Sequence, residues 1–307
     1  MRIVFLGTPE FAVNSLNALV EHHEVVAVVT QPDREKDRKG RIIEGAVKVR
    51  ANELGLPTYQ FEKIRRDGVE ILKNLAPDLM VTCAYGQMLS QEIIDIAPYG
   101  IFNVHGSLLP AYRGSAPIQR AIMNGEEYTG ITIMKTDIGM DSGDILASEK
   151  VKIEHEDYVD DLYQKLSAVG AKLLIETIDA VIKNQIVPSR QNESEVTYAP
   201  MIKKADSGID FSVDATVVRN RIRGVGYGVC EYNGSQIKVH KLDLAQNSQN
   251  APAGEVISAD KKGIVIACGN GAVSITELQQ SGKKKMRAVD FLNGVKIKVG
   301  EKFNGLA

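Results

Sequence analysis

The stretch IFNVHGSLLPAYRG, residues 101–114, combines an apolar run with an amide, an imidazole and a loop rich in Gly and Pro. Apolar side chains bracket Asn103 up to His105, and Gly, Ser and Pro follow, which predicts a short β-strand that opens into a loop. Residues two apart on a strand point to the same face. At the carboxyl end of a strand in an open α/β sheet, such a face borders the crevice where ligands bind. Asn103 and His105 are therefore candidate functional residues; the alternative is a buried pair satisfied by backbone partners.

The residues before this stretch predict an open, mostly parallel sheet. Apolar runs at residues 2–6 and 25–29 flank a helical pattern that starts at Pro9 and Glu10, both favoured in the first turn of a helix. Such a β-α-β order calls for a right-handed crossover and parallel strands. The chain lacks both G-x-G-x-x-G after its first strand and G-x-x-x-x-G-K-[ST], so the fold is Rossmann-like but no dinucleotide or nucleoside triphosphate is indicated.

Later patterns extend the sheet and then change character. Further strands are expected at residues 78–84, 129–134 and 145–153, and a long amphipathic helix at residues 157–182. Residues 185–205 are polar and lack periodicity, which predicts a linker. From residue 209 onward, short β-rich runs separated by turns predict a small β-barrel or sandwich, and the last expected strand covers residues 295–299.

The bulk composition is that of an ordinary globular protein, with 307 residues of which 44% are hydrophobic and 25% charged. No apolar run approaches the ~20 residues of a membrane span, and the N-terminus reads as a strand rather than a signal peptide. Three cysteines without a C-x-x-C pair argue against a disulfide framework and fit a reducing compartment. A cytoplasmic protein without a membrane partner is therefore expected.

Charge is distributed unevenly along the chain. Residues 206–307 contain 14 Lys/Arg and 10 Asp/Glu, net +4, whereas residues 1–205 contain 23 and 29, net −6. A basic C-terminal part indicates a polyanionic partner, although a solvated surface has the same composition. Within the loop at residues 31–42, basic residues alternate with acids, which is typical either of an arm that contacts nucleic-acid phosphates or of a solvated loop.

A third polar residue, Asp141, lies in a Gly- and Asp-rich loop at residues 137–144. If this loop and the loop after His105 leave the same edge of the sheet, Asn103, His105 and Asp141 converge. These three groups suit acyl transfer to a nitrogen, because the amide can donate to a developing oxyanion. The imidazole can donate to the same oxyanion or move protons, and the carboxylate can stabilise the charged imidazole or accept the proton of the amine through water. The alternative for Asp141 is a residue that caps its own turn.

No nucleophile or metal-ligand pattern accompanies these three residues. Cys83 lies in an apolar strand without a basic neighbour and reads as an inert core cysteine. The chain has no G-x-S-x-G motif, and its five histidines show no ligand spacing. Direct transfer without an acyl-enzyme and without a metal is therefore expected.

Four longer stretches carry a resemblance to a known family: FLGTPEFAV (5–13), NVHGSLLPAYRGSAPIQRAI (103–122), TGITIMKTDIGMDSGDIL (129–146) and ELQQSGKKKMRAVDFLNG (277–294). They resemble the methionyl-tRNA formyltransferases, a branch of the 10-formyltetrahydrofolate-dependent formyltransferases. The Asn, the His and the SLLP-YRG loop are similar across the wider family and imply the chemistry. The C-terminal block resembles the tRNA-acting branch and implies the acceptor.

The resemblance implies an α/β architecture in two parts. A Rossmann-like formyltransferase domain would cover residues 1–188, a linker residues 189–208, and a C-terminal, tRNA-binding β-barrel of OB type residues 209–307. The implied reaction is transfer of a formyl group from 10-formyltetrahydrofolate to the α-amino group of methionyl-initiator tRNA for translation initiation. Separately from the resemblance, a monomer in the cytoplasm is expected.

The resemblance also implies roles for individual residues. The catalytic set would be Asn103, His105 and Asp141. The formyl donor would bind along Ser107, Leu108, Leu109 and Pro110, with its pterin near Tyr85, Gln87, Met88 and Leu89. Phe11 would pack on the methionine side chain, unless it is a core aromatic of the first helix. The tRNA would be contacted by Arg34, Arg38, Lys39 and Arg41 and by Lys283, Lys284, Lys285 and Arg287, unless the latter four form a solvated turn.

Two segments depart from the family's pattern. The charged loop continues as EKDRKGRIIEGAVK, with extra acids and with Ala46 in place of a Pro, and VGYGVCEY replaces a Pro-rich segment after Gly224. These departures leave open which basic residue enters the acceptor stem. The rival functions are a formyltransferase that acts on a sugar-nucleotide amine, a formyltetrahydrofolate hydrolase, and an RNA-binding protein on a degenerate enzyme scaffold.

Overall fold

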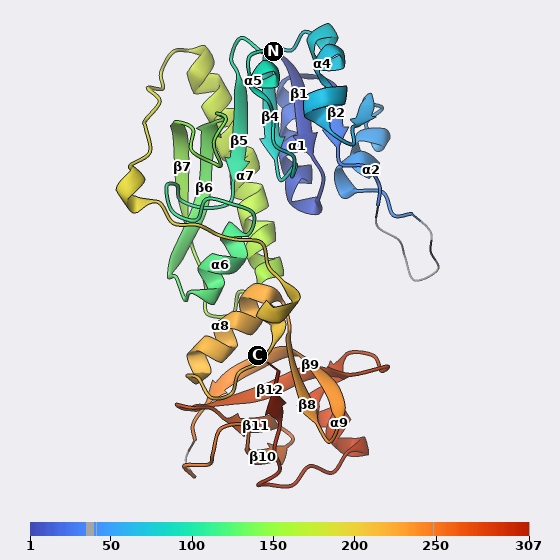
Figure 1. The fold of residues 1–307 in the computed structure, drawn as a ribbon, viewed down its shortest axis with the longest axis vertical. Helices are drawn as coiled ribbons and strands as arrows, with labels where there is room; N and C mark the ends of the chain where they lie inside the picture. The colour runs from blue at the N-terminus through green and yellow to red at the C-terminus, as the bar shows by residue number, and fades with distance from the viewer. Residues whose placement is uncertain (35–39, 41, 248, 307) are drawn as a thin grey trace. The chain divides into compact units, whose positions relative to one another are not determined.

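The computed structural model describes residues 1–34, 40, 42–247 and 249–306. The chain divides into two compact units (Figure 1). The first unit comprises Met1–Pro117, Tyr128–Lys152 and Leu162–Pro200. The second unit comprises Ile118–Glu127, Ile153–Asp161 and Met201–Ala307.

The first unit is built around a seven-stranded sheet with the strand order β3-β2-β1-β4-β5-β6-β7 (Figure 1). Its strands are β1 (Arg2–Gly7), β2 (Glu24–Thr30), β3 (Thr58–Gln60), β4 (Leu79–Cys83), β5 (Ile101–His105), β6 (Tyr128–Lys135) and β7 (Ile145–Lys152). The pairs that link β3 to β5 are parallel, whereas β6 is antiparallel to both β5 and β7. The predicted Rossmann-like, mostly parallel sheet is therefore confirmed.

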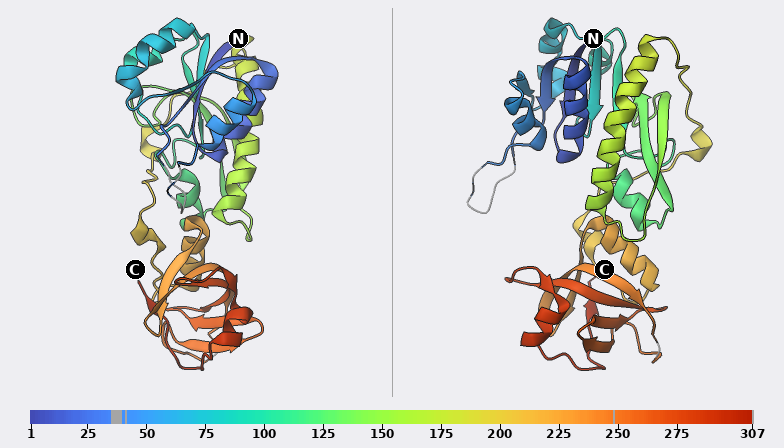
Figure 2. Two further views of the ribbon diagram at one scale, coloured as in Figure 1. Left: turned by 90° about the vertical axis from the view of Figure 1, so that its right-hand side faces the viewer. Right: turned by 180° about the vertical axis from the view of Figure 1, so that it is seen from behind.

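Helices cover both faces of this sheet. They are η1 (Glu10–Ala12), α1 (Val13–His22), α2 (Ala46–Glu53), α3 (Ile64–Asp67), α4 (Val69–Leu75), α5 (Gln91–Ile94) and most of α7 (Val159–Ile182). The short helix η2 (Glu193–Glu195) lies in the segment after α7 and buries none of its residues. Seen from behind, α1 and α7 lie in front of the strands (Figure 2), whereas α4 and α5 lie on the opposite side (Figure 1). Because both faces are covered, the run from Ile3 to Leu6 in β1 has no exposed surface and is apolar without a break.

Helix α7 packs closely against the strands that carry the candidate residues. A Cβ atom added at Gly170 of α7 would lie 2.9 Å from Cγ1 of Val104 in β5 and 3.6 Å from Cδ1 of Ile131 in β6. A side chain at position 170 would therefore push the helix away from β5. No described helix is both long enough and apolar enough to span a membrane.

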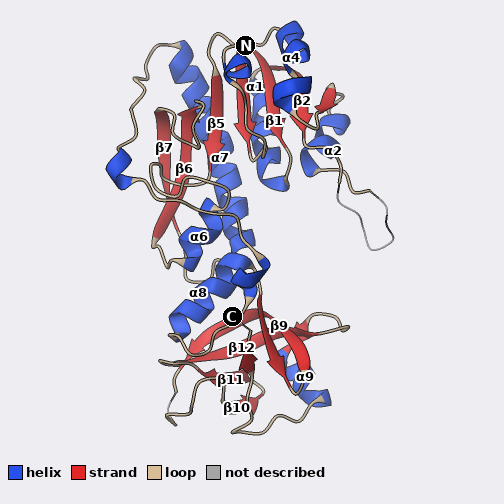
Figure 3. Cartoon of the chain, viewed as in Figure 1, coloured by secondary structure: helices blue, strands red, loops and turns tan. Residues whose placement is uncertain are grey.

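The second unit contains an antiparallel sheet with the order β10-β11-β12-β9-β8-β14, in which β13 also pairs with β12 (Figure 3). Its strands are β8 (Gly228–Tyr232), β9 (Ser235–Ala245), β10 (Val256–Asp260), β11 (Gly263–Ala267), β12 (Ala272–Gln280), β13 (Met286–Arg287) and β14 (Asn304–Gly305). Its helices are most of α6 (Pro117–Met123), η3 (Lys204–Ser207), α8 (Ala215–Val225) and α9 (Ala288–Gly294).

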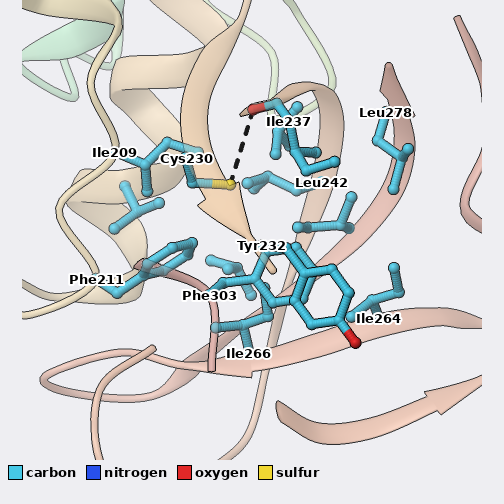
Figure 4. Close-up of a cluster of buried hydrophobic side chains, with 14 of the residues drawn as sticks. Ile209, Phe211, Cys230, Tyr232, Ile237, Leu242, Ile264, Ile266, Leu278 and Phe303 are labelled. Atoms are coloured by element: carbon cyan, nitrogen blue, oxygen red, sulfur yellow. Dashed lines mark hydrogen bonds between the residues drawn. The ribbon is translucent and has the colours of Figure 1, made fainter. Parts of the chain in front are cut away.

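The last residues of the chain join the two edges of this sheet. The Val256 N–H in β10 donates to the Glu301 carbonyl at 2.8 Å, and the Phe303 N–H donates to the Gly254 carbonyl at 2.8 Å. Strand β14 follows directly and pairs with β8. The sheet thus curls around a buried cluster that includes Phe303 and Cys230, whose thiol donates to the Ile237 carbonyl (Figure 4). The predicted barrel-like domain is confirmed.

Two parts of the second unit differ from the expectation. The expected strand at residues 295–299 is wrong, because these residues follow the end of α9 and form no strand. Val295 and Ile297 pack against the core, whereas Val299 is 61% exposed. The alternation of apolar and polar residues therefore reflects the packing of one side of the segment, without hydrogen bonds to a neighbouring strand among the described residues. Helices α8 and α9 were not expected. Helix α8 has a recognisable start, because the Asp214 carboxylate accepts the Thr216 N–H at 2.7 Å.

Candidate active site

Asn103 lies in the middle of β5 with its amide held in one orientation. Its Oδ1 atom accepts a hydrogen bond from the Thr82 hydroxyl of the neighbouring strand β4 at 3.0 Å. Because the oxygen end of the amide is used in this way, the Nδ2 end faces the other side and lies 3.5 Å from Oδ1 of Asp141. The arrangement presents an N–H donor beside a carboxylate.

His105 ends β5 and is 5% exposed. Its Nε2 atom lies 3.0 Å from the carbonyl oxygen of Tyr112. A carbonyl only accepts, so we assign the proton of the neutral ring to Nε2, and Nδ1 is then the acceptor nitrogen. Nδ1 lies 3.7 Å from Oδ2 of Asp141. This separation is long for a hydrogen bond but places a negative charge beside the ring whenever the ring gains a proton.

Asp141 reaches the same place from the opposite end of β5. Lys135 at the end of β6 stands opposite Phe102, and the Thr136 N–H donates to the Ile101 carbonyl at 2.8 Å. The loop that carries Asp141 therefore leaves the sheet near the start of β5, whereas the other loop follows His105 at its end. The two loops were expected to leave the same edge of the sheet, but they leave opposite edges because β6 is antiparallel to β5. The three side chains still converge, since the Asp141 loop folds back along β5.

Two residues far from Asp141 in sequence, Gly114 and Gln191, hold it in place through hydrogen bonds. Its Oδ2 atom accepts the Gly114 N–H at 2.8 Å, and its carbonyl oxygen accepts a hydrogen bond from the Gln191 side chain at 2.8 Å. Its φ angle of 49° lies in the left-handed region, which is uncommon for a residue with a side chain. The alternative of a residue that only caps its own turn does not account for these long-range contacts.

This geometry combines an amide donor, an imidazole and a carboxylate around one point, an arrangement that suits acyl transfer to an amine. Cys83 offers no covalent route. It has no exposed surface, and burial raises the pKa of its thiol to about 12. Among the described residues, no group of three or more His, Cys, Asp or Glu side chains is placed to hold a metal ion.

Comparison with known families accounts for both halves of the chain. The family described as formyl transferase matches residues 1–178, and the family described as formyl transferase, C-terminal domain, matches residues 201–296. The chain belongs to the formyl transferase family. The resemblance noted in its sequence is thereby confirmed.

Relatives of this formyl transferase are similar along nearly the whole chain. The methionyl-tRNA formyltransferase of Citrifermentans bemidjiense is 44% identical over 98% of this chain and 95% of its own. That of Bacillus licheniformis is 44% identical over 98% of this chain and 97% of its own. A solved N-formyltransferase from Helicobacter canadensis, in complex with folinic acid and dTDP-3-aminofucose, has a TM-score of 0.68 at 20% identity and covers 92% of this chain and 99% of its own. At that identity it shows the fold alone.

In this formyl transferase, Thr132 of β6 holds the first segment predicted to bind the formyl donor, which consists of Ser107, Leu108, Leu109 and Pro110. The buried Thr132 hydroxyl donates to the Ser107 carbonyl at 2.7 Å and accepts the Leu109 N–H at 3.1 Å. One side chain thus fixes both ends of a three-residue turn. Contact between this segment and the donor stays a prediction.

The side chains of the second predicted donor segment, Tyr85 to Leu89, differ in their exposure. Tyr85 is 4% exposed, burial raises the pKa of its hydroxyl, and that hydroxyl has no partner among the described residues. The Gln87 amide accepts an N–H from the start of α3 at 2.9 Å and donates to the Phe61 carbonyl at 2.9 Å. Leu89 packs against the sheet, whereas Met88 is 72% exposed. The Gln87 side chain therefore shapes the loop, and donor contact here stays a prediction.

The predicted acceptor contacts of the first unit differ in their surroundings. Phe11 is half-buried and packs edge-on against Tyr163 of α7, with 5.7 Å between the ring centroids. Arg34 is exposed and forms an ion pair with Glu62. The other three basic residues of this loop, Arg38, Lys39 and Arg41, lie outside the described residues.

In the second unit, Lys283, Lys284 and Lys285 are exposed before β13, and Arg287 is exposed at the end of β13, directly before α9. Lys285 forms an ion pair with Glu277 at 2.7 Å, and Arg287 forms one with Asp290 at 2.9 Å. Lys283 and Lys284 form no ion pair within the part of the chain that the structure describes. Within the predicted cluster, these two lysines are therefore the ones whose ammonium groups are not paired with a carboxylate of the described residues.

Three residues that shape the catalytic geometry were not predicted, namely Thr82, Gly114 and Gln191. Thr82 lies in a predicted strand, but its place opposite Asn103 follows from the parallel pairing of β4 with β5 in the structure. Gln191 carries no sequence signal, since it lies 50 residues after Asp141 in a polar segment read as a linker.

Proposed function

We propose that this chain transfers a formyl group from 10-formyltetrahydrofolate to the α-amino group of methionyl-initiator tRNA and so supplies formylmethionyl-tRNA for translation initiation. The convergence of Asn103, His105 and Asp141 within 3.5 and 3.7 Å carries the proposal for the chemistry. The acceptor is supported by the two relatives named methionyl-tRNA formyltransferase, which extend through the C-terminal half at 44% identity.

In the proposed reaction, the α-amine attacks the formyl carbon and a tetrahedral oxyanion forms. The Nδ2 group of Asn103 donates to this oxyanion. His105 is hydrogen-bonded to Tyr112 through Nε2, so its Nδ1 atom takes the proton that the attacking nitrogen loses. Asp141, 3.7 Å away, stabilises the charged ring. The C–N bond to the donor then breaks, the proton passes to the leaving nitrogen, and tetrahydrofolate departs.

The substrate positions follow from the same assignment. The donor binds along Ser107, Leu108, Leu109 and Pro110, with its pterin beside Tyr85, Gln87, Met88 and Leu89. Phe11 contacts the methionine side chain. The tRNA is contacted by Arg34, Arg38, Lys39 and Arg41 and by Lys283, Lys284, Lys285 and Arg287. The enzyme acts as a monomer in the cytoplasm. Light scattering at working concentration tests the monomer, and a mass of twice the chain mass of 33.5 kDa would exclude it.

One assay tests the proposed acceptor against its rivals. The protein is incubated with 10-formyltetrahydrofolate and, in separate reactions, with charged initiator tRNA, uncharged initiator tRNA, free methionine or an amino-sugar nucleotide. Formylation of charged tRNA only is the expected result. Equal transfer to the sugar amine, or release of formate with no acceptor, would replace the proposal by one of the rival enzymes. Binding of tRNA without any transfer would point to an RNA-binding protein.

A further inference from the structure

The segment at residues 189–199 is tied to both loops that form the catalytic geometry. At one end, Ser189 and Ile145 exchange backbone hydrogen bonds of 2.8 and 2.9 Å. At the other end, the Arg113 N–H donates to the Thr197 carbonyl at 2.9 Å, and the Ala199 N–H donates to the Arg113 carbonyl at 2.7 Å. The segment therefore bridges the loop that carries Asp141 and the loop that carries Gly114.

Gln191 is the side chain at the centre of this bridge. Its Nε2 atom donates to the carbonyl oxygens of Asp141 and Gly143, each at 2.8 Å. Its Oε1 atom accepts a hydrogen bond from Nε of Arg113 at 3.0 Å. Carbonyls only accept and a guanidinium only donates, so the orientation of the amide has one solution. Both hydrogens and the oxygen of the Gln191 amide are thereby used.

Arg113 is itself held in place. It is 4% exposed, and its guanidinium is paired with Glu193 at 2.8 Å. Burial restricts the Arg113 side chain, so its guanidinium can support the Gln191 oxygen even though Glu193 is itself exposed. The chain of contacts thus runs from Glu193 through Arg113 and Gln191 to the backbone on either side of Ser142.

We propose that Gln191 is a positioning residue that holds the Asp141 carboxylate against Asn103 and His105. This inference rests on the catalytic role proposed for Asp141. The Asp141 loop begins at the far end of β5 and must fold back to reach His105. Its backbone at residue 141 is left-handed, which is unfavourable for a residue with a side chain unless the surroundings impose it. The two bonds from Gln191 supply that restraint.

Two substitutions separate the parts of the Gln191 amide. Gln191→Met keeps the shape and removes every hydrogen bond. Gln191→Glu keeps the acceptor for Arg113 but removes the donors to residues 141 and 143. Both variants should lower kcat by about tenfold or more, because a small misplacement of a catalytic group costs up to ~10²-fold. The KM values for the donor and for tRNA should stay within about twofold, because Gln191 is not assigned to either substrate.

The matched control is Gln185→Met, the same change at an exposed position of the same region. It should leave kcat unchanged. Amide exchange of Gly114, measured by NMR, reports the position of Asp141 without any turnover, since this N–H donates to Oδ2 of Asp141 at 2.8 Å. Exchange should quicken in both Gln191 variants and not in Gln185→Met. Unaltered kcat or unaltered Gly114 exchange in Gln191→Met and Gln191→Glu would overturn the inference.

A double-mutant comparison distinguishes the positioning role of Gln191 from the catalytic role proposed for Asp141. Asp141→Asn alone should lower kcat strongly, and Gln191→Met should add little further loss in that background, because a residue that acts through Asp141 has nothing left to position. An equal loss in both backgrounds would show that Gln191 acts independently and would overturn the inference alone. Near-normal turnover of Asp141→Asn would remove the catalytic role of Asp141 and the inference with it.

Discussion

The orientation of the Asn103 amide decides what this residue can do in the reaction. Its oxygen is occupied by the Thr82 hydroxyl, so the nitrogen faces Asp141 and His105. An amide turned the other way would present an acceptor to a developing oxyanion and would oppose the reaction. The Asp141 carboxylate, which only accepts, thus selects the donor end of the amide, and the Thr82 hydroxyl satisfies the oxygen.

Asn103→Ala should therefore lower kcat by about a hundredfold or more, as loss of one oxyanion donor does. The measurement is steady-state formylation of charged initiator tRNA, with the melting temperature recorded for each protein. Asn52→Ala, at an exposed position of α2, is the matched control and should retain full turnover. Near-normal kcat in Asn103→Ala would remove this residue from its assigned role.

The three cysteines allow a test of the direct-transfer mechanism. All are buried, and burial raises the pKa of each thiol to about 12. At pH 8 the folded protein should therefore have no thiolate and should not react with a disulfide reagent, while the denatured chain should expose three reactive thiols. Because the folded pKa values exceed the unfolded value of 9.0, the corresponding stability is present below pH 9 and is lost as the pH rises toward 12. Rapid inactivation by a thiol reagent at pH 8 would contradict the inert assignment.

At the scale of elements, the antiparallel strand β6 supports both halves of the site. Through Thr132 it holds the turn from Ser107 to Leu109, and its far end leads into the loop of Asp141. A parallel strand in the same place would have sent the Asp141 loop away from the start of β5. The direction of β6 therefore determines the path by which Asp141 arrives.

Thr132→Val should raise the KM for 10-formyltetrahydrofolate severalfold and destabilise the protein by about 1–3 kcal/mol, since the buried Leu109 N–H loses its acceptor. The matched control is Thr136→Val, the same change at the first residue after β6. The Thr136 hydroxyl is buried without a partner among the described residues, so its removal should be neutral or stabilising. Equal effects of the two substitutions would show that Thr132 does not act through the turn.

At the scale of the whole molecule, charge is divided between its two parts. The C-terminal residues 206–307 have a net charge of +4 on a chain whose net charge is −2, with 14 Lys/Arg against 10 Asp/Glu in that range. Pairing with Glu277 and Asp290 occupies Lys285 and Arg287, so Lys283 and Lys284 are the members of the cluster that can bind phosphate at least cost.

Lys283→Glu combined with Lys284→Glu should raise the KM for tRNA about tenfold and make tRNA binding less sensitive to salt, because fewer counterions are released. The KM for the formyl donor should not change. Lys261→Glu combined with Lys262→Glu, in the turn between β10 and β11, makes the same change in net charge and is the matched control. If both pairs weaken tRNA binding equally, the effect is one of bulk charge and the cluster is only solvated surface.

Residue spacing was sufficient for the parts of this protein that depend on local order. The strand ending at His105, the parallel sheet before it and the β-rich second unit all follow from periodicity and turn residues. The expected strand at residues 295–299 failed because alternation also arises in a segment that packs one side onto a core. Helix α8 was not predicted, because the sequence around it is rich in β-forming residues and the N-cap at Asp214 is a short signal by comparison.

Local order in the chain was enough to predict the fold class and to single out Asn103 and His105, and the resemblance to a family indicated the chemistry and the acceptor. The way in which Asp141 joins them depends on the folded chain, because β6 runs antiparallel and its loop must fold back along β5. Only the tertiary structure placed Gln191 against that loop, 50 residues away in sequence. Contacts between distant segments depend on the direction and packing of whole strands, and no local pattern in the chain encodes them.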